Sequence, residues 1–200
     1  SSSSSSSFST TSGDDEEDET NDETNGSSSD EGEGGEGRRK KPTIAVVGVG
    51  AIGGYYGARL WESGRYDVRF GMRGKQLETC AREGLRVTSI DGDVFVPPSE
   101  ISIYEDPKDV GPVDWVVVCL KSFALSDDDE TFTDLILPLL DSDRKTTRIL
   151  TIMNGLVEDD LIRLLRARLG CDDDDDDNEG GFCAAVYGGM AFVCCNRTEP

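Results

Sequence analysis

The chain has 200 residues, of which 36% are hydrophobic, and it carries 41 acidic against 20 basic side chains and no histidine. The length allows one or two domains. The acidic excess argues against a nucleic-acid partner, because the basic cluster at residues 38–41 lies beside a much larger acidic segment. The lack of histidine excludes mixed cysteine–histidine zinc sites and dehydrogenases that use a histidine as acid or base.

Most of the acidic side chains lie in three low-complexity stretches. Residues 1–37 hold 12 of them, residues 127–130 hold 4 and residues 172–181 hold 7, so that the other 18 acids stand against 20 bases, a net charge of +2. We expect a disordered tail over residues 1–41 and one folded domain over 42–200, with the other two stretches as acidic loop insertions. A poly-aspartate calcium site is the alternative for the last stretch, but the ordered alternation and terminal glutamate of a calcium loop are missing.

The folded part opens with a strand, a glycine turn and a helix. Thr43–Gly48 is a β-branched run with two apolar faces, which is typical of a central parallel strand. Ala51–Ser63 then places apolar residues at four-residue steps, and Gly64 follows as a stop signal. Tyr66–Met72 alternates apolar and polar residues, so it predicts a second strand that completes a βαβ unit.

The remaining sequence continues this alternation of strands and helices. Such an order predicts an α/β fold with a doubly wound parallel sheet of the Rossmann type. The further predicted elements are helices over 76–83, 131–140 and 157–169, a hairpin over 85–96 that turns at Asp91-Gly92, and strands over 113–120, 147–153, 182–187 and 190–195.

The glycine turn has the pattern G-x-G-x-x-G between a buried strand and a helix. In this setting Gly48 permits the tight turn, Gly50 lets the backbone approach a pyrophosphate, and Gly53 lets the helix pack closely on the strand. Bare main-chain amides and the positive end of the helix dipole would then hold the phosphates, Gly50's amide among them. A glycine turn that binds nothing is the alternative. The predicted cofactor-binding residues are Gly48, Val49, Gly50, Ala51, Ile52 and Gly53.

The residue that ends the second strand distinguishes the two nicotinamide cofactors. An acidic side chain there accepts bonds from the ribose of NAD, whereas this sequence has Arg73. A guanidinium bonded to a 2′-phosphate contributes about 1.5–3 kcal/mol, which favours NADP. Lys75 is placed to assist, and the alternative is that Arg73 is a solvated surface arginine.

Two polar residues follow two further predicted strands. Lys121 comes after the run that ends at Leu120, and Asn154 comes after the run that ends at Met153. Ligands of open parallel sheets bind beyond the carboxyl ends of the strands, near the point where the strand order reverses. Lys121 could donate to a substrate carbonyl or carboxylate, and Asn154 could orient nicotinamide or substrate, so both are candidate catalytic and cofactor-binding residues.

These motifs together resemble the ketopantoate reductase family, which reduces 2-dehydropantoate to pantoate with NADPH on the route to coenzyme A. The later residues Gly188–Arg197 resemble the last strands before the family's second domain. The stretches that carry the resemblance are Ile44–Gly57, Asp67–Phe70 with Arg73-Gly74, Val117–Phe123 and Met153–Leu156.

The resemblance implies an NADP-dependent oxidoreductase that acts on a small 2-oxo acid. It implies phosphate recognition by Arg73 and active-site roles for Lys121 and Asn154. The family's principal catalytic lysine and its carboxylate partner belong to a helical C-terminal domain that this chain lacks. We therefore expect cofactor binding with poor turnover, and a homodimer that would form through that domain.

Two other functions fit the same cofactor motifs. One is another NADP-dependent dehydrogenase, acting on hydroxy acids or sugar phosphates. The other is a nonenzymatic NADP-sensing scaffold whose acidic tail recruits basic partners.

The cysteines and the hydropathy bear on the compartment. None of the cysteines forms a C-x-x-C pair, so we expect no metal site and interpret them as reduced thiols, with disulfides as the alternative. The sequence shows no apolar stretch of the ~20 residues that span a bilayer and no signal peptide. We expect a soluble cytoplasmic protein, with an organelle as the alternative. The six cysteines are at positions 80, 119, 171, 183, 194 and 195.

Overall fold

The fold is known from a computed structural model, which describes residues 40–121, 129–141, 146–170, 184–191 and 196. The chain divides into two units, residues 1–38 and 39–200, and every described residue belongs to the second. The predicted tail up to residue 39 and the insertion at 172–181 lie outside the described residues.

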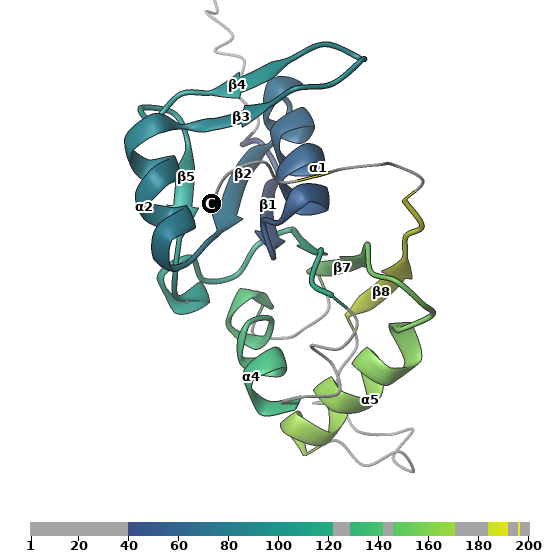
Figure 1. The fold of residues 1–200 in the computed structure, drawn as a ribbon. Coiled ribbons are helices and arrows are strands. Elements are labelled where there is room, and N and C mark those ends of the chain that lie inside the picture. Colours follow the sequence, from purple (N-terminus) through teal and green to yellow (C-terminus); the bar gives the residue numbers. More distant parts are fainter. Residues whose placement is uncertain (1–39, 122–128, 142–145, 171–183, 192–195, 197–200) are drawn as a thin grey trace, which may run out of the picture. The chain divides into compact units, whose positions relative to one another are not determined.

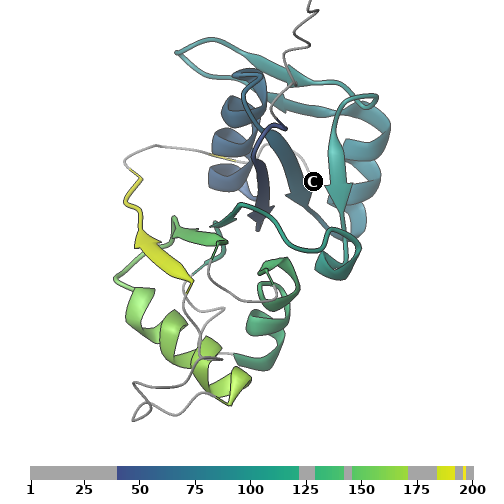
Figure 2. The ribbon, with the colours of Figure 1, turned by 180° about the vertical axis from the view of Figure 1, so that it is seen from behind.

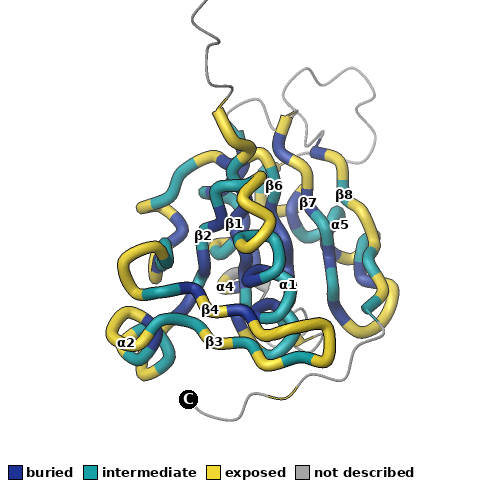
Figure 3. The backbone as a smooth tube through the Cα atoms, turned by 90° about the horizontal axis from the view of Figure 1, so that it is seen from above, coloured by how far each residue is buried: buried dark blue, intermediate teal, exposed yellow. Residues whose placement is uncertain are grey.

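Six parallel strands form one sheet in the order β5-β2-β1-β6-β7-β8 (Figures 1 and 3). From β1 the chain adds strands outward on one side and then returns to add β6 on the other side, so the order reverses between β1 and β6. This arrangement confirms the predicted Rossmann-type sheet. The strands are β1 (Thr43–Val47), β2 (Asp67–Gly71), β5 (Ser102–Tyr104), β6 (Trp115–Val118), β7 (Arg148–Thr151) and β8 (Ala185–Gly188).

Helices cover both faces of the sheet (Figures 1 and 2). Alternate residues of each strand point to opposite faces, so Val46 and Phe70 pack with α1 and α2, whereas Ala45 and Val116 pack with α4 and α5. Figure 3 shows the buried residues running along the central strands. The helices are α1 (Ala51–Glu62), α2 (Gly74–Glu83), α4 (Asp129–Asp134) and α5 (Glu158–Leu169), with 3₁₀ turns at Pro107–Asp109 and Leu137–Leu139.

A separate hairpin packs against α1. Strands β3 (Leu85–Val87) and β4 (Val94–Val96) pair antiparallel, which confirms the hairpin predicted around Asp91-Gly92. Gly92 has a φ of +103°, a conformation that favours glycine. The Arg59 guanidinium of α1 donates to the Gly92 carbonyl oxygen at 2.5 Å and so fixes the turn to the helix.

The structure corrects three of the predicted elements and adds two others. The single helix expected over 131–140 is wrong: α4 ends at Asp134, and a 3₁₀ turn follows, because Pro138 has no N–H to continue a helical ladder. The strand expected over 182–187 is β8, shifted to Ala185–Gly188, and Met190 and Ala191 lie in no strand. The rest of the 190–195 run lies outside the described residues, and β5 and its neighbouring 3₁₀ turn were not predicted.

Two findings concern the expected compartment. Among the described helices, none has both the length and the apolar character needed to cross a membrane. Cys80 and Cys119 are free thiols, while the other four cysteines lie outside the described residues.

Candidate functional site

The glycine loop joins β1 to α1 at the carboxyl edge of the sheet. Gly48 has a φ of +87°, so its predicted role in the tight turn is confirmed. A Cβ atom at Gly53 would lie 2.3 Å from the Gly48 carbonyl oxygen and 3.1 Å from the Cβ of Cys119. The predicted role of Gly53 in close helix packing is therefore confirmed as well.

Gly50 has a different environment. No protein atom lies within 4 Å of the position that a Cβ at Gly50 would occupy, and its φ of −81° is open to any residue. The expectation of a bare amide is wrong here, because the Gly50 N–H donates to the Gly48 carbonyl oxygen at 2.8 Å across the tight turn. The open space beside Gly50 is nevertheless where a ligand could approach the backbone.

The first turn of α1 supplies the remaining amides. The first intrahelical bond at this end is from the Gly54 N–H to the Gly50 carbonyl oxygen, at 2.9 Å. The amides of Ala51, Ile52 and Gly53 therefore have no acceptor in the helical ladder. Three such donors at the positive end of a helix dipole form an arrangement that binds phosphate groups.

A side chain from α2 fixes the loop from the other side. Gln76 donates through Nε2 to the carbonyl oxygen of Val49, whose own side chain is buried in the core. Gln76 lies three residues after Arg73, the N-cap residue of α2. The sequence pattern gave no signal for this contact, since the two residues are 27 positions apart.

A small cleft of about 90 Å³ runs across the carboxyl ends of β6, β1, β2 and β5. It brings together Gly48 and the exposed Arg73, two of the predicted cofactor-binding residues. It crosses the point where the strand order reverses, which is where open parallel sheets bind ligands. The lining residues are Val47, Gly48, Gly71, Met72, Arg73, Tyr104, Glu105, Leu120 and Leu135.

Tyr104 forms the floor of this cleft. Its hydroxyl donates to the Val46 carbonyl oxygen at 3.4 Å, and burial raises the pKa of the phenol well above its usual range. The ring lies so close over β2 that a Cβ at Gly71 would come within 2.7 Å of the hydroxyl oxygen. Gly71 is therefore needed for Tyr104 to pack there.

Glu105 follows Tyr104 and was not among the predicted site residues. It is exposed and lines the same cleft as Arg73. Because β5 was not predicted, the sequence alone gave no reason to place the two residues together. Their closeness follows from the pairing of β5 with β2.

Lys121 and Asn154 leave the sheet at equivalent positions of neighbouring strands. Val118 of β6 is the register partner of Thr151 of β7. Lys121 lies three residues after Val118, and Asn154 lies three residues after Thr151. Both are exposed at the carboxyl edge, as expected. Neither lines the small cleft, so the structure does not join them to Gly48 and Arg73 in one cavity.

A half-buried hydrogen bond braces the loop that carries Asn154. The Thr151 hydroxyl, at 1% exposure, donates to Oε1 of Glu158 at 2.9 Å. Thr151 ends β7 and Glu158 begins α5, so the bond closes the segment between them, in which Gly155 has a φ of +95°.

Cys119 lies beneath the glycine loop and is a poor nucleophile. Burial raises the pKa of its thiol to about 12, so the thiol is neutral at ordinary pH. The Cβ of Cys119 lies beside the backbone of Gly53, where α1 packs closely on the loop. The contact indicates a packing role for Cys119.

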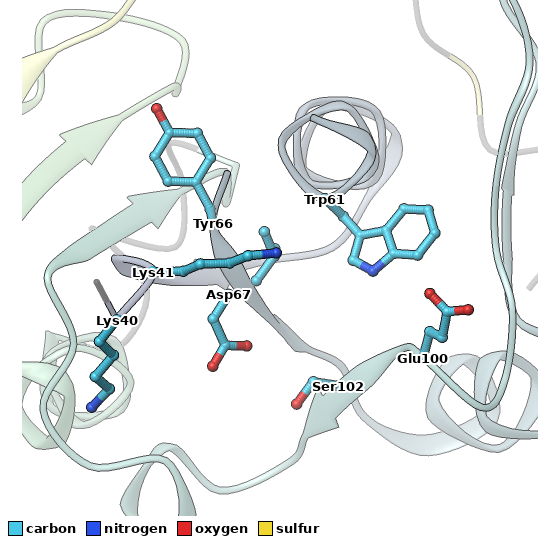
Figure 4. Close-up of a pocket in the computed structure, with 8 residues that line it drawn as sticks. Lys40, Lys41, Trp61, Tyr66, Asp67, Glu100 and Ser102 are labelled. Carbon is cyan, nitrogen blue, oxygen red and sulfur yellow. The ribbon is translucent and has the colours of Figure 1, made fainter. Parts of the chain in front are cut away.

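A second, larger hollow of about 330 Å³ lies at the opposite edge of the sheet, where β2 and β5 begin (Figure 4). Lys40 and Lys41 stand there beside Asp67 and Glu100, so the charges nearly balance. None of the predicted site residues lines it. In the part of the chain that the structure describes, no group of three or more potential metal ligands is found.

Comparison with known proteins agrees with this geometry. The sequence profile of the family described as "Ketopantoate reductase PanE/ApbA" matches residues 44–200. A 2-dehydropantoate 2-reductase of a Nostoc species is 30% identical over 154 residues, which are 76% of this chain and 40% of that protein. The corresponding protein of Mesorhizobium japonicum is 34% identical over 113 residues, which are 56% of this chain and 32% of that protein.

A solved structure is similar over the same region. The crystal structure of the 2-dehydropantoate 2-reductase from Geobacter metallireducens matches with a TM-score of 0.61 at 39% sequence identity. The match covers 79% of this chain and 44% of that chain. The chain thus spans less than half the length of these relatives.

Proposed function

Because the chain belongs to the ketopantoate reductase PanE/ApbA family, we propose that residues 42–200 are the NADP-binding half of an oxidoreductase that reduces 2-dehydropantoate to pantoate. The family uses a nicotinamide cofactor. One observation carries the choice of NADP: Gly48 and Arg73 line a single cleft where the strand order reverses. The substrate is the one for which the two similar reductases are named.

The residues around the glycine loop fit a dinucleotide. The free amides of Ala51, Ile52 and Gly53 would bind the diphosphate, and the open space at Gly50 lets it approach the backbone. Arg73 carries no hydrogen bond or ion pair among the described residues, so its guanidinium is available to a 2′-phosphate. When bound, the cofactor supplies the hydride for reduction of a ketone.

Lys121 and Asn154 would act on the substrate. Both stand at the carboxyl edge beyond β6 and β7, on the far side of the glycine loop from Arg73. There the Lys121 ammonium would donate to the carboxylate or carbonyl oxygen of a 2-oxo acid, and the Asn154 amide would orient substrate or nicotinamide.

Titration with both reduced cofactors tests the cofactor assignment. We expect the chain to bind NADPH about ten- to a hundredfold more tightly than NADH, since the Arg73 guanidinium bonds to a phosphate that NADH lacks. In Arg73→Gln the preference should fall to a few fold, with NADH affinity nearly unchanged. Isothermal calorimetry measures both constants, and Lys75→Gln is the neighbouring control. Equal affinities in the wild-type chain would contradict the assignment.

A spectrophotometric assay tests the substrate assignment. NADPH consumption at 340 nm should require 2-dehydropantoate. Lys121→Ala should slow it about ten- to a hundredfold, by loss of a charged donor to the substrate. The same assay applies to any longer natural product that contains these residues. Faster consumption with other 2-oxo acids, or none with 2-dehydropantoate in either form, would refute the assignment.

A further inference from the structure

Two opposite charges leave the sheet side by side and do not pair. Arg73 follows β2 and Glu105 follows β5, and these strands are neighbours. Directly before them, the Met72 N–H donates to the Tyr104 carbonyl oxygen at 3.0 Å. Among the described residues no ion pair or hydrogen bond is formed by the side chain of either Arg73 or Glu105, although both line the same cleft.

The residues on both sides of Glu105 are anchored by contacts. Tyr104 is buried on the face of β2 beside Gly71, and its hydroxyl donates to the Val46 carbonyl oxygen. On the other side, Asp106 caps a 3₁₀ turn by accepting from the Lys108 N–H at 2.9 Å. Glu105 is thus an exposed carboxylate that lines the cleft between two anchored neighbours.

The order of the strands gives Glu105 a position relative to the cofactor. Along the carboxyl edge the strands lie in the spatial order β1, β2, β5. The glycine loop therefore comes first, Arg73 second and Glu105 third. Neighbouring strands lie about 4.8 Å apart, and a dinucleotide running outward from the loop presents diphosphate, ribose and base in that order. With the 2′-phosphate at Arg73, this order would place the base near the end of β5, where Met72 and Tyr104 line the cleft.

A carboxylate such as that of Glu105 can bind only hydrogen-bond donors on the purine base. An ionised glutamate accepts hydrogen bonds and donates none, and it repels a phosphate. Adenine offers an exocyclic 6-amino group with two N–H donors. A 6-oxopurine has a carbonyl oxygen at the same place, which a carboxylate repels.

We propose that Glu105 is a specificity-determining residue whose carboxylate accepts a hydrogen bond from the 6-amino group of adenine and so selects adenine over 6-oxopurine dinucleotides. The inference rests on the proposed function, because it takes the cleft as the place of the adenosine half of NADP. It assigns to Glu105 a base contact that is independent of the 2′-phosphate contact of Arg73.

Calorimetric titration of the purified chain with NADPH and with its hypoxanthine analogue tests the proposal. We expect wild-type protein to bind NADPH about tenfold more tightly than the analogue, by a hydrogen bond to a charged acceptor. In Glu105→Gln the ratio should fall to about one, because a glutamine amide can accept from the amino group or donate to the oxo group. Glu100→Gln, which removes an exposed carboxylate at the opposite edge, should keep the wild-type ratio.

The outcomes separate this inference from the cofactor assignment. If wild-type protein binds NADPH and the analogue equally, or if Glu105→Gln keeps the tenfold ratio, the role of Glu105 is overturned while NADPH binding stands. If neither nucleotide binds, the cofactor assignment itself fails and the inference with it. Circular dichroism of Glu105→Gln checks the fold, which we expect to be unchanged since the side chain has no partner among the described residues.

Discussion

Gly50 and Gly53 belong to one motif and yet have opposite surroundings. At Gly53 the protein itself leaves no room, because the Gly48 carbonyl oxygen lies 2.3 Å from the position of a Cβ. At Gly50 the protein leaves open space and an ordinary φ of −81°. The described residues around position 50 therefore do not themselves require glycine, and we propose that the open space admits a bound diphosphate.

Two alanine substitutions separate packing from binding. Gly53→Ala should lower the free energy of unfolding by about 1–3 kcal/mol, since α1 must move away from the loop to admit the Cβ. Gly50→Ala should leave stability unchanged or slightly raised, because the new residue fits the backbone. It should nevertheless weaken NADPH binding at least tenfold by filling the approach to the diphosphate. Urea unfolding and calorimetric titration measure the two effects, and a Gly50→Ala protein with wild-type affinity would contradict a diphosphate at this position.

At the scale of elements, the sequence predicted those helices and strands whose residues show a clear local hydrophobic pattern. The run β1, glycine loop and α1 follows from a doubly apolar strand and a helical period next to one another, so its boundaries were predicted within a residue or two. α4 was predicted too long, because the apolar period of 131–140 continues through Pro138, where the backbone cannot. β5 has three residues, too few for any period to show, and its place in the sheet comes from pairing with β2.

The candidate site divides in the same way. Gly48, Gly53 and Arg73 were predicted because each task depends on a position relative to one strand end. The contact of Gln76 with Val49 joins two elements, and the meeting of Arg73 with Glu105 depends on the unpredicted β5. A sequence motif cannot reveal side chains that only the packing of separate elements brings together. Gln76 of α2 and Glu105 after β5 are such residues, and the glycine motif did not predict them.

At the scale of the whole molecule, the sheet order is the property from which the site follows. Parallel strands bring every carboxyl end to one edge, and the reversal between β1 and β6 places the glycine loop at the centre of that edge. Helices on both faces bury the strands, and this burial also encloses thiol and phenol groups beneath the site. Because burial raises the pKa values of Cys119 and Tyr104, the free energy of unfolding depends on pH in the alkaline range.

The half-buried thiol of Cys119 predicts how the free energy of unfolding changes with pH. Burial raises its pKa from 9.0 to about 12, so in this range the unfolded chain releases a proton that the folded chain retains. Fewer protons bound in the unfolded state mean that the free energy of unfolding falls as pH rises, from about pH 9 towards 12. Cys119→Ala should reduce the slope of this fall, measured by urea unfolding at half-unit steps of pH. Cys80→Ala, which removes a thiol whose pKa is raised less, should change the slope less, and identical slopes in wild-type and Cys119→Ala proteins would show that Cys119 is not the linked group.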